Sequence, residues 1–192
     1  MTGDEKRFEW LQFVESWQLG QTVDSSQLRA LRQLLLQLEI DDRGFERVCS
    51  VYVSNAGYDP ETAKLIVSKL ERVLNSPTFE RLLAANQVMT SLNADWGAYE
   101  ELLPLALSVL FHKDENIVQE LLMPSVIAIG KTSFATKDEK LVKILLKSGR
   151  KWYTASDKEL AKICALGLCL AKSETGVNCY GKKHDLKEIF GT

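Results

Sequence analysis

The tetrapeptide Gly130-Lys131-Thr132-Ser133 ends as a phosphate-binding loop ends, with a lysine beside a hydroxyl side chain. Such a loop needs an earlier glycine, five residues before Gly130, so that bare backbone N–H groups can wrap the phosphates. Ser125 occupies that position, and the bulky run Val-Ile-Ala-Ile follows it. We therefore interpret Gly130 as the C-cap of a helix, followed by a polar turn, and expect no cofactor.

Zinc chemistry is the second candidate, because Cys164, Cys169, Cys179 and His184 lie within 21 residues. Structural zinc sites usually pair cysteines two to four residues apart on a turn. Here Cys164 and Cys169 fall in an apolar helix, where five residues turn the side chain by roughly 140°. We predict buried thiols and no metal site. Together with Cys49, these unevenly spaced cysteines indicate a reducing compartment, the cytoplasm or the nucleus.

Catalytic groups are scarce. The chain has only two histidines, His112 and His184, and neither has an acid or a nucleophile in a familiar local arrangement. The acidic pairs fall in expected first helical turns, where carboxylates complement the helix dipole; they are Glu100-Glu101, Asp114-Glu115 and Asp138-Glu139. We predict that the protein is not an enzyme, the alternative being a site assembled from residues far apart in sequence.

A basic segment carries the remaining chemistry. Lys140, Lys143 and Lys147 follow an i, i+3, i+7 spacing, which places them on one stripe of a helix. Such a stripe attracts phosphate backbones, and exposed rings can stack on unpaired bases. The alternative is a solvated helix face with the aromatic rings in the core. The predicted surface for an anionic partner comprises Lys140, Lys143, Lys147, Arg150, Lys151 and Trp152.

Charge is unevenly distributed along the chain. The net charge is −2, but residues 131–192 hold 13 basic and 7 acidic side chains, and residues 1–130 hold 11 and 19. This asymmetry favours an anionic partner for the C-terminal part. We predict one domain, residues 1–192, with a candidate subdomain boundary near residues 130–136.

Apolar side chains recur at helical spacing through most of the sequence, which predicts an all-α fold of about nine or ten helices packed as antiparallel hairpins. Expected helix starts are Asp24 or Ser25, Asp59-Pro60, Ser76-Pro77, and the capping boxes Thr136/Glu139 and Ser156/Glu159. The expected helices include 4–18, 24–39, 59–74, 98–112, 115–129, 137–148 and 157–172. No stretch reaches the roughly 18 apolar residues of a membrane span, so no membrane partner is expected.

Within residues 99–130, Pro104 lies in the first expected helix, Asp114-Glu115 in the turn, and Val118 at the opening of the second helix. This pattern resembles a HEAT repeat. Gln119 departs from the family pattern, in which an arginine is usual, and no second clear unit follows. The resemblance implies stacked helix pairs whose inner surface binds another macromolecule; the alternative is an irregular helical bundle.

These observations favour a non-enzymatic interaction or scaffold module that binds a protein partner or self-associates. Trp10 and Trp17, with Phe13 between them, are candidate anchors for such a partner if the first helix is not fully buried. The alternative, which we favour, is that these rings pack into the core. The alternative function is a small helical subunit that contacts nucleic acid through the basic segment, residues 137–152.

Overall fold

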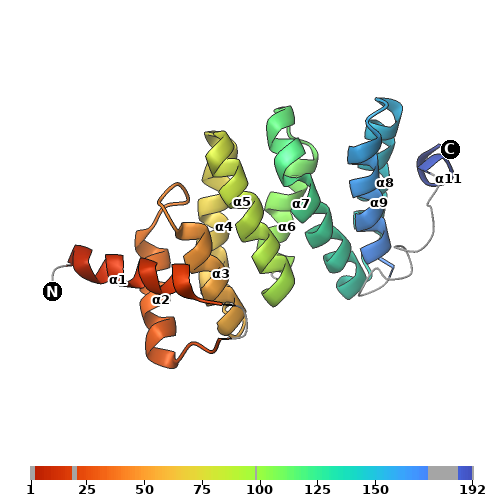
Figure 1. Cartoon of the computed structure of the whole chain (residues 1–192). Coiled ribbons are helices and arrows are strands. Elements are labelled where there is room, and N and C mark those ends of the chain that lie inside the picture. The colour runs from red at the N-terminus through yellow and green to blue at the C-terminus, as the bar shows by residue number, and fades with distance from the viewer. Residues whose placement is uncertain (1–2, 19–20, 98, 173–185, 192) are drawn as a thin grey trace. The chain divides into compact units, whose positions relative to one another are not determined.

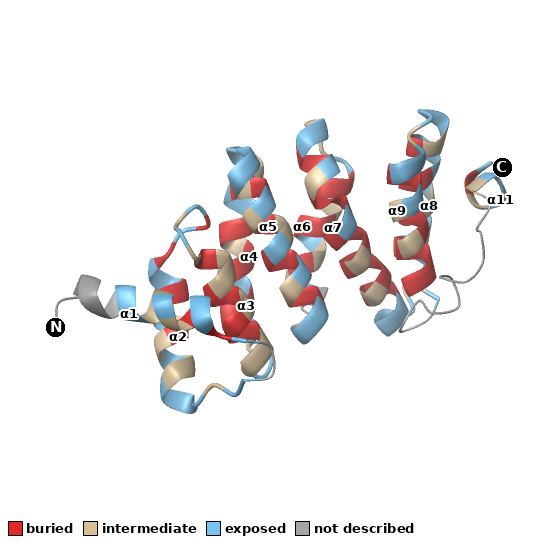
Figure 2. Ribbon diagram, in the orientation of Figure 1, coloured by how far each residue is buried: buried red, intermediate tan, exposed pale blue. Residues whose placement is uncertain are grey.

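The computed structural model describes residues 3–18, 21–97, 99–172 and 186–191 of the 192-residue chain. Within these ranges, all regular secondary structure is helical: ten α-helices and one π-helical turn (Figure 1). The predicted all-α fold is therefore confirmed. Buried residues follow one face of most helices, and exposed residues follow the other (Figure 2), as expected where amphipathic helices enclose a core.

The chain divides into two compact units, residues 1–98 and residues 99–192. The first contains α1 (Gly3–Ser16), α2 (Ser25–Gln37), α3 (Phe45–Asn55), α4 (Pro60–Asn75), α5 (Phe79–Ser91) and the π-helical turn η1 (Leu92–Trp96). The second contains α6 (Tyr99–Leu110), α7 (Glu115–Thr136), α8 (Glu139–Thr154), α9 (Lys158–Leu170) and α11 (Leu186–Phe190). The candidate boundary near residues 130–136 falls inside α7, which continues through this segment.

In the N-terminal unit, α3 packs against α1, α2, α5 and η1. Its side chains Phe45, Val48 and Cys49 are fully buried. Arg47 of α3 donates from Nε to the carbonyl oxygen of Val14 at 2.9 Å and also donates to that of Trp17. These bonds satisfy carbonyls at the end of α1 that have no partner within the helix.

In the C-terminal unit, α6 packs against α7, α8 packs against α9, and α7 also packs against α9. The α7–α9 contact brings two backbones together, because a Cβ on Gly130 would overlap the carbonyl oxygen of Gly167. Gly130 therefore lies where two helices pack together, and the predicted C-cap at Gly130 was wrong because α7 continues to Thr136. Residues 130–133 are helical, and Thr132 and Ser133 are buried, so this segment does not have the form of a phosphate-binding loop.

Several helix starts differ from the predictions. Asp24 and Asp59 cap α2 and α4 as expected, but the caps of α5, α8 and α9 are Thr78, Asp138 and Asp157. In each of the latter cases a second capping residue lies one or two positions after the predicted one. The expected capping boxes Thr136/Glu139 and Ser156/Glu159 were wrong, because Thr136 lies in the last turn of α7 and Ser156 has a left-handed backbone, φ 64°.

Candidate partner-binding surface

Helix α8 presents the predicted basic segment on an amphipathic frame. Leu141, Leu145 and Trp152 are buried on one side. With 100° per residue, Lys140, Lys143, Lys147 and Lys151 fall within an arc of about 80° on the other side, and all four are exposed. We call these four residues the lysine face. They extend for about 17 Å along the helix, at 1.5 Å per residue.

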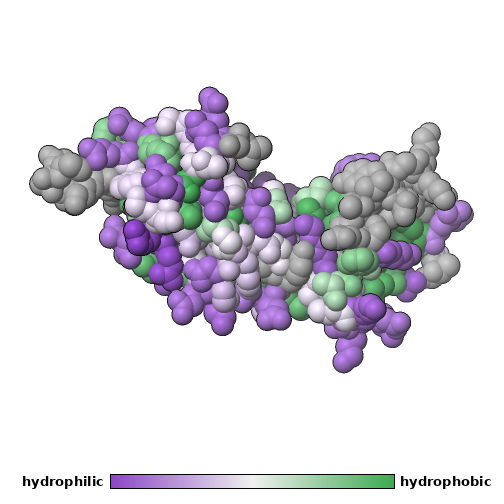
Figure 3. Space-filling model, turned by 90° about the horizontal axis from the view of Figure 1, so that it is seen from below, coloured by the Kyte–Doolittle hydropathy of each residue, from purple (hydrophilic) through white to green (hydrophobic). Residues whose placement is uncertain are grey.

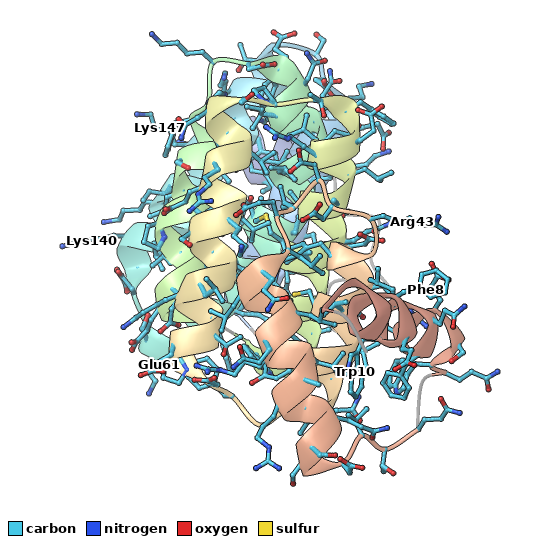
Figure 4. The ribbon with its side chains drawn as sticks, turned by 90° about the vertical axis from the view of Figure 1, so that its left-hand side faces the viewer. Phe8, Trp10, Arg43, Glu61, Lys140 and Lys147 are labelled. Carbon is cyan, nitrogen blue, oxygen red and sulfur yellow. The ribbon has the colours of Figure 1, made fainter. Side chains whose placement is uncertain are left out.

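The lysine face points into solvent. In Figure 4, the side chains of Lys140 and Lys147 extend away from the ribbon on the same side. Among the residues that the structure describes, no acidic side chain forms an ion pair with Lys140, Lys143, Lys147 or Lys151. Arg150, also predicted for this surface, is exposed at one edge of it. The five cations therefore share one helix surface. The spacing predicted this for Lys140, Lys143 and Lys147, and α8 extends past the expected end at residue 148 to include Arg150 and Lys151.

Trp152 does not belong to that surface. Its side chain is only 8% exposed, and Lys151 Nζ lies 4.4 Å from the centroid of its ring. A ring that is buried and covered by an ammonium group cannot stack on a nucleic-acid base. Trp152 was grouped with its exposed neighbours because the basic stripe ends beside it. The heptad-like offset from Leu145 is the one feature that could have placed it in the core.

Of the three candidate anchor residues in and just after α1, Trp17 is buried and Trp10 and Phe13 are half-buried. Trp17 is buried, donates from Nε1 to the carbonyl oxygen of Gln21 at 3.2 Å, and lies against the Arg47 guanidinium. Trp10 is half-buried and contacts Phe13 edge-on, with 5.5 Å between ring centroids. The exposed aromatic of this helix is Phe8, which projects outward in Figure 4 and is 62% exposed.

The cysteines divide into two classes. Cys49 and Cys164 are free and buried, as predicted. Burial raises the pKa of the Cys164 thiol to about 11, although the hydrogen bond from its Sγ to Ser148 Oγ at 3.6 Å acts in the opposite direction. The raised pKa makes this thiol a poor nucleophile. Cys169 is disulfide-bonded, so the prediction of a free thiol was wrong there.

Metal-ligating clusters are absent from the described part of the chain: no group of three His, Cys, Asp or Glu side chains could hold an ion there. The predicted candidates Cys179 and His184 lie outside the described residues. Because disulfides are typical of oxidising compartments, the cysteines alone do not support the cytoplasmic prediction. As for the membrane, each described helix falls short of the length or apolar character needed to span one.

The acidic pairs have local structural roles. Asp114 and Asp138 are N-caps that accept hydrogen bonds from the backbone N–H groups of Asn116 and Lys140, at 2.9 and 2.8 Å. His112 also serves this turn, since its Nδ1 accepts from the backbone N–H of Asp114 at 3.1 Å. These contacts match the dipole and capping roles expected of such residues.

No family model matches the chain, and neither a curated protein nor a solved structure is detectably similar to it. The geometry of the described residues is therefore the basis for any functional assignment.

Proposed function

We propose that the protein is a non-enzymatic helical interaction module, and that the lysine face of α8 binds an acidic surface of a partner protein. The observation that carries the proposal is the alignment of Lys140, Lys143, Lys147 and Lys151 on one exposed face, without acidic partners among the described side chains. A rigid helix fixes the spacing of these charges. Matching charge patterns mainly set the rate and orientation of protein association.

A protein partner is favoured over nucleic acid by the position of Trp152. Single-stranded nucleic acid is recognised by basic grooves combined with exposed rings on which bases stack. The ring next to this basic stripe is buried. Lysine makes up most of the stripe, and its ammonium group cannot form the paired hydrogen bonds that the planar guanidinium group of arginine makes to a phosphate or a guanine. The stacked pairs α6–α7 and α8–α9 also fit the HEAT-like resemblance, which implies extended binding faces.

The lysine face is tested by charge reversal. The triple variant Lys143→Glu, Lys147→Glu, Lys151→Glu places three carboxylates where the partner's acidic surface would lie. We expect its affinity for the partner to fall by about tenfold or more, because like charges then face each other. The matched control is Lys64→Glu, Lys113→Glu, Lys158→Glu, which changes the net charge equally at three exposed positions outside α8.

The measurement has two stages. Proteins that bind the wild-type chain and the control, but not the α8 triple variant, are identified from nuclease-treated cell extract. The interaction is then reconstituted with the purified partner at ~50 and ~200 mM salt, where screening should weaken it. Equal retention of every partner by the α8 triple variant would refute the proposal. Salt-sensitive binding of labelled single-stranded RNA, lost in the same variant, would replace it with the nucleic-acid alternative.

A further inference from the structure

One aromatic ring holds the last described helix, α11, in place. Phe190 is only 3% exposed, and its ring lies so close over Gly149 of α8 that a Cβ on this glycine would overlap it. α11 contains five residues and packs against both α8 and α9. Because helices this short are unstable on their own in water, the position of α11 depends on these contacts.

α11 borders an apolar groove between α8 and α9. The groove has a volume of about 330 Å³ and is lined by Val142 and Leu146 of α8, Ala165 and Leu168 of α9, and Ile189 of α11. In Figure 3, apolar and hydrophilic surfaces adjoin over the helices of the C-terminal unit. Amphipathic helices of partner proteins bind apolar grooves of this kind.

Charged side chains border this groove. Its two charged lining residues are Lys172, just after α9, and Glu188 of α11. Glu188 belongs to α11 and would leave the rim with it. On α8, Lys143 and Arg150 lie three residues before and four residues after Leu146, so they flank it on the helix surface. Both are exposed. An apolar floor with cations along its rim complements a helix that has one apolar face and acidic flanks.

We infer that this groove binds an acidic amphipathic helix of a partner protein, and that α11 occupies part of the same site in the free chain. The inference rests on the proposed function and specifies the partner's chemistry. The partner helix would place an aromatic ring over Gly149, as Phe190 does, aliphatic side chains toward Leu146 and Leu168, and carboxylates toward the rim. Since α11 must leave first, the apparent affinity equals the affinity of the open site multiplied by the fraction of chains whose site is open.

The test uses the full chain and a fluorescein-labelled peptide in which the α11 sequence, Leu-Lys-Glu-Ile-Phe, is flanked by glutamates. The variant Ile189→Ala, Phe190→Ala removes the side chains that hold α11. We expect it to bind the peptide about tenfold more tightly than the wild type, because α11 no longer competes. The control Phe79→Ala, Leu83→Ala removes two exposed apolar side chains from α5 and should bind like the wild type.

A blocking substitution tests whether the peptide binds at Gly149. Gly149→Val is added to the variant Ile189→Ala, Phe190→Ala, called the released variant because α11 is no longer held. The valine side chain fills the place of the Phe190 ring, and peptide binding should be lost. Circular dichroism checks the fold, and Gly149→Ala replaces Gly149→Val if the valine variant is unfolded. Peptide binding that is no tighter in the released variant, or that is unaffected at Gly149, would overturn the inference. So would a wild-type dimer in sedimentation velocity that dissociates on release of α11, because the occupant would then be a second copy.

The two proposals fail in different ways. A natural partner that requires the lysine face but binds equally well after changes at Gly149, Ile189 and Phe190 would leave the proposed function intact and refute the groove. Loss of the lysine-face effect, with peptide binding still governed by Gly149, would refute the electrostatic surface and retain the groove.

Discussion

Asp59 joins the start of α4 to α2 through its carboxylate. It accepts hydrogen bonds from the backbone N–H of Glu61 at 3.1 Å and from the Thr62 hydroxyl, and Arg32 Nε lies 3.4 Å away. The Thr62 hydroxyl is the main reason that the pKa of Asp59 lies below its usual value. Because the folded-state pKa is lowered, ionised Asp59 stabilises the fold above the unfolded-state pKa of about 4.

We therefore predict that Asp59→Ala lowers the free energy of unfolding by about 1 kcal/mol near neutral pH, the usual value of an N-cap. The difference from wild type should shrink as the pH falls through the folded-state pKa of Asp59, because the protonated carboxyl no longer stabilises the wild type. Urea unfolding at about pH 7 and about pH 3 measures this. Glu71→Ala, an exposed change on the same helix, should have little effect at either pH; a pH-independent difference for Asp59→Ala would contradict the assignment.

The sequence predicted the positions of individual side chains only where the deciding residues are neighbours along the chain. The cap Asp59 was predicted because Pro60 follows it, and the exposure of Lys140, Lys143 and Lys147 followed from their spacing. The burial of Trp152 depends on α8 meeting its neighbours in space, which periodicity in one segment does not specify. The role of Gly149 likewise depends on Phe190, a residue 41 positions away.

Among the elements, α7 and α9 cross with their backbones in contact. A Cβ on Gly130 would overlap the carbonyl oxygen of Gly167 and lie 2.9 Å from Leu170 Cβ, and one on Gly167 would lie 3.0 Å from Val126. Backbone atoms cannot move aside as the end of a flexible side chain can. The run Ala-Leu-Gly-Leu at residues 165–168 predicts an apolar helix, and α9 contains it, but its glycine is explained only by the crossing.

Gly130→Ala should therefore destabilise the protein by about 1–3 kcal/mol, the usual cost of overpacking. This exceeds the gain of up to about 1 kcal/mol from replacing a helical glycine by alanine. Thermal or urea unfolding provides the measurement. Gly57→Ala is the matched control, because a Cβ at Gly57 would meet nothing within 4 Å. A Gly130→Ala variant as stable as this control would show that the helices can separate at little cost.

At the scale of the whole chain, the charge asymmetry and the structural division do not coincide. Residues 1–98 carry 10 basic and 14 acidic side chains, and residues 99–192 carry 14 and 12. The strongly basic part begins only at residue 131, within α7, because α6 and the first turns of α7 are acidic. A change in charge along the sequence therefore marked a change of surface within one unit, whereas the boundary at residues 98–99 has no Pro- or Ser-rich linker to indicate it.

Each unit has its own core, so damage to one core should remain within that unit. We predict that Gly130→Ala accelerates amide hydrogen exchange in α6–α9 and leaves the protection of α2–α5 within about a factor of two of wild type, because opening free energies follow the cooperative unit to which an amide belongs. Hydrogen exchange with mass spectrometry resolves the two sets of peptides. An equal loss of protection in both sets would show that the two compact units unfold as one, and the boundary would then be a division of contacts without a thermodynamic counterpart.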